Sequence, residues 1–281
     1  MACYARIINM GYFARSVNKP PVTLVFICLL LLWQIGVWIF EPSPLVLPSP
    51  IEVGNEFLKN PKIFLFNAAH TLANTLVGFA LAVVIGVSLA VAIVYSRFLE
   101  ATLYTSLVAM NSVPKVALAP LFVIWLGTGD QSKVGMAFLI AIFAIVIDAV
   151  LGLRTVDPDM LDLGRSLRGS EFKLLWKIRF PSALPSIFAG MKVAISLALV
   201  GTIVGEFVAA QHGLGYVILS AQGVFDTARV FVALVILAIM GTLLFYLIEF
   251  AEQKTLPWHV SRRAEQKVAP TQKIPTVATV P

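Results

Sequence analysis

Long apolar runs alternate with short polar segments along this chain. A helix needs about twenty apolar residues to cross the hydrocarbon core of a bilayer, so each run of that length predicts one membrane span. The third run is the least regular, since Asn111, Pro114, Lys115 and Pro120 lie within it. The six predicted spans cover residues 22–40, 71–95, 101–125, 134–153, 186–209 and 230–250.

A polar block at residues 154–185 interrupts this apolar pattern. Asp157 is followed by Pro158, which is the order of an N-cap and a first helical position. Gly169 is suited to end that helix, because glycine tolerates the left-handed conformation common after a helix C-terminus. The block therefore predicts a short helix outside the membrane.

A second short helix is expected directly after the first. Ser170 is placed to cap it, and the apolar residues Phe172, Leu175 and Ile178 follow at helical spacing. Pro181 and Pro185 are expected to stop it, since proline lacks the backbone donor of a helix interior.

The composition supports a membrane location. Hydrophobic residues make up 59% of the chain, charged residues 13%, and the mean hydropathy is +0.89. Soluble domains carry roughly 25% charged residues. The predicted fold class is therefore an all-α integral membrane protein, and the first run, which lacks a small-residue cleavage site, is expected to be a retained span.

The distribution of positive charge predicts the orientation. Most of the 21 Lys and Arg residues fall in the terminal segments and the polar block, and few fall in the segments between them. Because short cytoplasmic segments are enriched in Lys and Arg, both termini and the polar block are expected in the cytoplasm. The net charge of +6 follows from this bias and does not indicate nucleic-acid binding.

Four parts are expected along the chain. They are a cytoplasmic lead-in at 1–21, a first span with a proline-rich outer connection at 22–68, a core domain at 69–250 and a cytoplasmic tail at 251–281. The tail has few large apolar residues and is expected to be partly disordered.

The polar block resembles the cytoplasmic loop of the membrane subunits of binding-protein-dependent ABC importers. That loop bears the pattern E-A-A, three residues, G, nine residues, I-x-L-P. Here Asp162-Leu163-Gly164 occupies the first triplet, Arg168 the glycine position, and Ile178-Arg179-Phe180-Pro181 the end. The spacing is kept, while Asp, Leu-Gly and Arg replace Glu, Ala-Ala and Gly.

Other segments resemble the nitrate, sulfonate and taurine branch of this family, and the resemblance extends over about 180 residues. The segments are 113–121 (VPKVALAPL), 125–127 (WLG), 152–158 (GLRTVDP), 183–185 (ALP), 205–206 (GE) and 213–216 (GLGY).

The resemblance implies a six-span type I importer fold with cytoplasmic coupling helices, in a bacterial inner membrane. It also implies the partners: two ABC ATPase subunits, a second copy of this permease, and an extracytoplasmic solute-binding protein. No G-x-x-x-x-G-K-[ST] sequence occurs, so ATP and its magnesium are expected on the partner ATPase, with no cofactor on this chain and no enzyme activity of its own.

The loop residues are expected to couple this subunit to the ATPase. The docking face is expected to use apolar anchors, among them Leu175, with charged residues such as Lys173 at the rim. The coupling set is Asp162, Leu163, Gly164, Arg165, Leu167, Arg168, Gly169, Phe172, Ile178 and Pro181.

Polar residues inside the spans are candidates for the translocation pathway, since charge at membrane depth is costly. Pro114 is expected to break the third span, which places Asn111, Pro114 and Lys115 beside protein or water. Asp148 either lines the pathway, pairs with a lysine such as Lys115, or is packed as a neutral acid. Glu206 either helps to form an outer gate, caps a helix or faces water.

Three further residues carry expectations. Lys192 is expected either to reach the inner interface or to pair with Asp148. His70 and His212 lie at span ends without other ligands at metal-binding spacing, so interfacial hydrogen bonding is expected.

The solute is expected to be a small oxoanion, a sulfonate or another small organic solute. A vitamin or pyrimidine precursor is an alternative solute. A second class, an ion-coupled secondary transporter or channel, would use Asp148 and Glu206 as a proton relay, but such proteins are usually built from repeats, and none is visible here.

Overall fold

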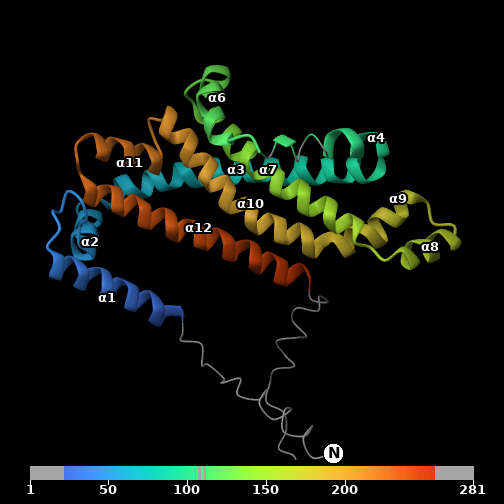
Figure 1. Ribbon diagram of the computed structural model, residues 1–281, viewed down its shortest axis with the longest axis horizontal. Coiled ribbons are helices and arrows are strands. Elements are labelled where there is room, and N and C mark those ends of the chain that lie inside the picture. The colour runs from blue at the N-terminus through green and yellow to red at the C-terminus, as the bar shows by residue number, and fades with distance from the viewer. Residues whose placement is uncertain (1–21, 105, 107–108, 111, 257–281) are drawn as a thin grey trace, which may run out of the picture.

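The computed structural model describes residues 22–104, 106, 109–110 and 112–256, and this part of the chain is almost wholly helical (Figure 1). Four helical stretches are long and apolar enough to cross a membrane, 61–95, 130–154, 171–208 and 227–255. The elements are α1 (Val22–Phe40), α2 (Pro50–Lys59), α3 (Pro61–Tyr95), α4 (Arg97–Leu99), η2 (Glu100–Tyr104), η3 (Lys115–Leu118), α6 (Ala119–Leu126), α7 (Asp130–Arg154), α8 (Pro158–Ser166), α9 (Glu171–Leu174), η4 (Leu175–Arg179), α10 (Phe180–Val208), α11 (Leu214–Gly223) and α12 (Thr227–Thr255).

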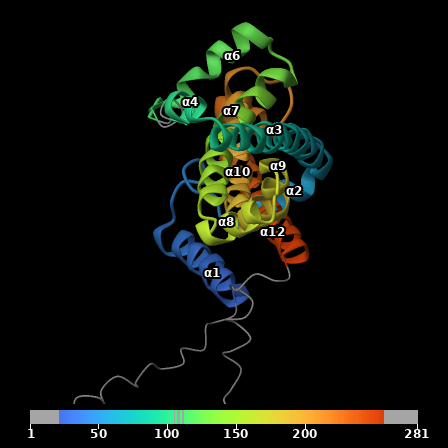
Figure 2. The same ribbon diagram turned by 90° about the vertical axis from the view of Figure 1, so that its right-hand side faces the viewer.

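Helices α3, α7 and α10 form the centre of the bundle, and α12 lies along α10 (Figures 1 and 2). Glycines allow the central helices to approach closely. A Cβ on Gly201 of α10 would lie 2.7 Å from the carbonyl oxygen of Met136, and a Cβ on Gly78 of α3 would lie 2.5 Å from the Cβ of Ala137. Small residues at such contacts are typical of helix packing in membranes.

The predicted third span is wrong as one continuous helix. Residues 100–104 form a wide π turn, Pro114 is extended with φ −68° and ψ 92°, and a new helical segment begins at Lys115. The expectation that Pro114 breaks the span is confirmed. The resulting apolar stretch 115–126 is too short to cross a bilayer alone.

The second predicted span begins ten residues earlier than expected. Helix α3 starts at Pro61, because proline fits the first helical position and because Asn67 and Thr71 are buried rather than exposed to lipid.

The expected stop at Pro181 and Pro185 is also wrong, since α9, η4 and α10 form one helical stretch of 38 residues, 171–208. The π turn of η4 precedes Pro181, and the Phe180 amide donates to the Leu175 carbonyl five residues back. A wider turn relieves the clash that a proline ring makes with a regular helix.

Helix α2 lies at the end of the bundle opposite α8 and α9 (Figure 1). Ser49 and Glu52 form a capping box at its start. Glu56 pairs with Lys59 and with Arg229 at the start of α12, both at 3.1 Å. Burial raises the pKa of Glu56, but these two hydrogen-bonded cations outweigh burial and hold the pKa below its ordinary value.

Candidate functional site

The polar block folds into two short helices that project from one end of the bundle (Figure 1). Asp157 caps α8, and its Oδ1 accepts from the amide of Asp159 at 2.9 Å. Ser170 caps α9, and its Oγ accepts from the amide of Lys173 at 3.4 Å. Both predicted caps are confirmed, and we call residues 157–179 the hairpin.

The turn between the two helices uses a residue other than the expected one. Arg168, not Gly169, is left-handed, with φ +56°. The amide of Gly169 donates to the carbonyl of Gly164 at 3.0 Å, which is the C-terminal closure of a Schellman motif. A Cβ on Gly169 would lie 2.7 Å from that carbonyl oxygen, so the glycine is needed for space.

Charged and polar contacts fix the hairpin on itself and on the bundle. Arg165 contacts Asp162 at 3.2 Å and Glu171 at 3.1 Å, so it joins α8 to α9. The hydrogen bond and charge of Glu171 raise the pKa of Arg165 above its ordinary value. The Tyr95 hydroxyl donates to the Glu171 carbonyl at 2.8 Å, which ties the hairpin to the end of α3.

Two residues of the family pattern contact each other inside the hairpin. A Cβ on Gly164 would lie 3.1 Å from Cδ1 of Ile178, so Ile178 packs over the glycine. Pro181 lies in the first turn of α10, just after the π turn. These residues shape the hairpin rather than its exposed surface.

Large apolar side chains project from the hairpin, exposed within the part of the chain that the structure describes. Leu167 is 75% exposed and Phe172 is 70% exposed. Leu175, an expected anchor, is buried, and Trp176 is exposed in its place. We call the exposed set the hairpin patch: Met160, Leu163, Leu167, Phe172 and Trp176. Exposed apolar patches of this kind mark docking surfaces.

A buried polar cluster occupies the opposite end of the bundle. Glu206 of α10 is only 1% exposed. Its Oε1 accepts from the Thr71 hydroxyl at 2.8 Å and its Oε2 accepts from the amide of Gly215 at 2.7 Å. The same Thr71 oxygen accepts from the amide of Leu214 at 2.8 Å, and Asn67 Oδ1 accepts from the amide of Gly213 at 2.8 Å.

This cluster caps the start of α11, which has no side-chain cap of its own at its N-terminal residue. Gly213 has φ +112°, and a Cβ there would clash with the Glu206 carboxylate. Of the three roles expected for Glu206, the geometry matches the capping carboxylate and contradicts the water-exposed one. The cluster closes the turn between α10 and α11.

Two of the remaining pathway candidates, Lys115 and Asp148, contact α7 or α10. Lys115 Nζ lies 4.5 Å from the ring centroid of Phe143, a cation–π contact. Asp148 is half-buried against α10, where the missing side chain of Gly190 leaves room for it. Asn111 lies outside the described residues.

Lys192 has a partner that the sequence did not indicate. It pairs with Glu252 of α12 rather than with Asp148, and the pair joins α10 to α12. The stacked rings of His70 and His212, with centroids 5.2 Å apart, were also missed, because 142 residues separate them. Within the described part of the chain, no group of three His, Cys, Asp or Glu could hold a metal ion.

The apolar bundle and its projecting hairpin define a membrane permease subunit. Residues 82–256 match the family described as the binding-protein-dependent transport system inner membrane component. This match covers more than half of the chain, and the chain belongs to that family. Its role is therefore transport rather than catalysis, and membership implies ATPase and solute-binding partner proteins.

Several relatives match nearly end to end. The riboflavin transport system permease protein of Chloroflexus aurantiacus is 36% identical over 258 residues, which cover 91% of this chain and 96% of that protein. The formylaminopyrimidine transport permease protein of Halalkalibacterium halodurans is 33% identical, over 87% of this chain and 98% of that protein. The taurine transport system permease protein of Escherichia coli is 29% identical, over 88% and 91%. The resemblance to the taurine branch is confirmed.

A solved structure confirms the fold. The MetNI methionine ABC transporter, in an inward-facing conformation, aligns with a TM-score of 0.59 and 20% identity, over 69% of this chain and 95% of that chain. The all-α importer fold expected from the sequence is therefore the fold of this chain.

Proposed function

We propose that this chain forms one half of the translocation pathway of an ATP-driven importer, with two copies related by a two-fold axis and one ATPase subunit on each. The hairpin is the docking element for the ATPase. It lies in the cytoplasm of a bacterium together with both chain termini. A solute-binding protein delivers the solute to the opposite face.

One observation carries this proposal: the hairpin patch lies at the end of an unbroken helical stretch. Residues 171–208 run from Phe172 in the patch to the residues beside Glu206 at the far end. A displacement of α9 by a partner is therefore transmitted along α10 without a flexible joint. The bond from Tyr95 to Glu171 adds a second connection, to α3.

The patch has the composition of a docking surface. Leu167, Phe172 and Trp176 supply large apolar side chains, and Arg168 and Lys173 lie exposed beside them. Anchors of this kind supply most of the affinity of an interface, whereas rim charges act mainly on orientation and association rate.

The solute is proposed to be small, with a sulfonate, another oxoanion or a small organic acid as the first candidate. A heterocyclic precursor is the second candidate, because the relatives named for riboflavin and formylaminopyrimidine are 36% and 33% identical, compared with 29% for the taurine permease. Membership of the family does not favour the ion-coupled alternative.

Roles in the pathway are proposed for the residues that interrupt the spans. The break at Pro114 and the amine of Lys115 lie beside α7, where they can face a dehydrated solute. Asp148 lies five residues after Phe143 on α7, where α7 contacts α10 at Gly190. Glu206 holds the turn between α10 and α11 closed at the outer end.

The test is co-purification of the ATPase with a doubly substituted permease. Leu167→Asp with Phe172→Asp places two carboxylates in the hairpin patch and should release the ATPase on detergent extraction, while the subunit still inserts. Leu58→Asp is the matched control, because Leu58 is 72% exposed at the opposite end of the bundle. If the double variant retains the ATPase as well as the control does, the hairpin is not the docking element.

A further inference from the structure

Two histidines stack on each other at the end of the bundle opposite the hairpin. His70 belongs to α3, and His212 lies in the segment between α10 and α11. Their ring centroids are 5.2 Å apart, with an interplanar angle of 25°. Phe66, one turn before His70, makes an edge contact with both rings, at centroid distances of 4.7 Å and 5.5 Å. We call the two stacked imidazoles the histidine stack.

The histidine stack lies next to the buried polar cluster around Glu206. His70 precedes Thr71, whose hydroxyl donates to Glu206. His212 precedes Gly213, whose amide donates to a side chain one turn before His70 on α3. These hydrogen bonds are buried, whereas His212 is exposed and His70 is half-buried. The stack is therefore open to solvent, and a change in it would act on the turn that the buried bonds close.

The charge of the imidazoles determines whether the histidine stack is favourable. Two neutral aromatic rings gain free energy from offset stacking. Histidine is the side chain whose charge ordinarily changes between about pH 5 and pH 8. Two imidazolium rings with centroids 5.2 Å apart would repel each other, because like charges at such a distance are poorly screened where protein replaces part of the water. The stack is therefore stable only while at least one ring is neutral.

Neighbouring charges can favour one proton on the histidine stack but do not balance a second. The carboxylate of Asp130 is close enough to His70 for their charges to interact. The same carboxylate already contacts the amine of Lys133 at 3.4 Å. Both oxygens of Glu206 already accept hydrogen bonds. The titratable residues at this end of the helices around the stack are Lys62 of α3, Asp130 and Lys133 of α7, Glu206 of α10 and Tyr216 of α11.

We propose that the histidine stack is a pH-sensitive switch for the turn between α10 and α11. The turn is closed while one imidazole is neutral, and it opens when both rings are protonated. Opening breaks the bonds that join the amides of Gly213 and Leu214 to side chains of α3, so this end of α10 gains freedom to move. The proposal concerns contacts within the chain and holds whichever partner the hairpin binds.

The test is hydrogen exchange of the purified subunit at about pH 7.5 and about pH 5.5, on either side of the ordinary titration of histidine. Labelling times are scaled to the intrinsic exchange rate at each pH. The amides of residues 213–215 all donate to side chains of the buried cluster, so they report on the turn. In the wild type, their protection should fall by roughly tenfold at the lower pH, because repulsion at this spacing is of that order.

Two single variants separate the charge of the rings from their packing. His212→Phe keeps a ring against His70 but cannot take up a proton, so its protection should be the same at both pH values. His70→Phe makes the same change from the other side and should give the same result. Wild-type protection of residues 213–215 at the higher pH shows that each variant keeps the folded turn.

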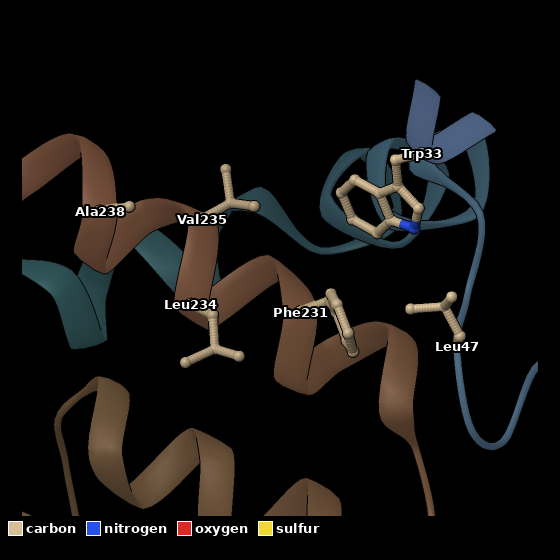
Figure 3. Close-up of a pocket in the computed structure, with 6 residues that line it drawn as sticks. All are labelled: Trp33, Leu47, Phe231, Leu234, Val235 and Ala238. Atoms are coloured by element: carbon tan, nitrogen blue, oxygen red, sulfur yellow. The ribbon is translucent and has the colours of Figure 1, made fainter. Parts of the chain in front are cut away.

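An uncharged ring pair in the same molecule provides the internal control. Trp33 of α1 and Phe231 of α12 have centroids 5.5 Å apart and line the apolar groove between these helices, which Figure 3 shows. Neither ring can take up a proton. Protection of the α12 amides around Phe231 should therefore be equal at the two pH values.

Three results would overturn the proposal. The first is wild-type protection of residues 213–215 that does not change on acidification. The second is a fall that persists in both His212→Phe and His70→Phe, which would assign the response to another group, such as Glu206. The third is an equal fall around Phe231, which would show general loosening of the bundle rather than a switch at the turn.

Discussion

Replacing Glu206 by glutamine tests whether the buried cluster at the outer end works as the hydrogen bonds indicate. The substitution keeps the size and shape of the side chain. It replaces one of two accepting oxygens by an NH₂ group, in a site where both oxygens accept, one from Thr71 and one from the amide of Gly215.

Neither orientation of the amide satisfies the cluster. If its NH₂ faces Gly215, two donors oppose each other. If its NH₂ faces Thr71, the Thr71 hydroxyl proton loses its acceptor on residue 206, even though the Thr71 oxygen can accept from that NH₂ as well as from the amide of Leu214. A buried donor left without an acceptor costs about 1–3 kcal/mol, so the free energy of unfolding should fall by that amount.

The assay is reversible unfolding of the purified subunit by SDS titration from mixed micelles, followed by circular dichroism. The matched control is Glu52→Gln, the same chemical change in an exposed capping box where glutamine serves as well as glutamate. Equal stability of the two variants would refute the account of Glu206 as a required double acceptor.

Three further predictions concern packing, transport and pH. Gly201→Ala should lower the free energy of unfolding by about 1–3 kcal/mol, because its methyl group would press on Met136. Gly54→Ala, which meets nothing within 4 Å in the interior of α2, should be neutral or stabilising by the same SDS titration. Asp148→Ala should slow solute uptake into vesicles that hold the assembled transporter while leaving co-purification of the ATPase intact, and unchanged uptake would assign Asp148 to packing. The pKa of Glu56 is lower in the folded protein than its ordinary value of 4.5. Its ion pairs therefore stabilise the fold fully at pH values above 4.5. That stabilisation is lost as the pH falls through the lower pKa of the folded state. Protease cleavage near α2 should therefore rise on acidification in the wild type, and an unaltered acid response in Glu56→Gln would contradict this.

Local chemistry in the sequence was sufficient to predict the hairpin. The capping oxygens of Asp157 and Ser170 act on amides two or three residues away, so the sequence alone contains both partners. The break at Pro114 is local for the same reason. Each of these features depends on residues that are neighbours in the chain.

Features that depend on distant residues were not predictable. Leu175 and Trp176 both follow Phe172 at helical spacing, and only packing against the bundle buries the first and exposes the second. Thr71 and Glu206 are 135 residues apart in the sequence, and Lys192 is joined to Glu252 across two helices. No periodicity in one segment indicates its partner in another.

The failure at Pro181 has a different origin. Proline was expected to end a helix, which holds for regular helical turns. The sequence does not reveal that η4 widens into a π turn just before the proline, because a π turn has no strong residue signature.

The wide turn in η4 also determines how insertions and deletions in this stretch would act. A regular helix rotates by about 100° for each residue. One residue added or removed between Phe172 and Gly205 would therefore rotate the exposed side chains of α9 about the helix axis relative to the bundle. A π turn accommodates one extra residue as a local bulge. Removal of one residue within 175–179 would therefore keep both ends in phase, although it would also remove the wide turn that makes room for Pro181. The same removal further along α10 would turn Phe172 away from its present direction. The angular setting of the two ends depends on the number of residues between them more than on their identities.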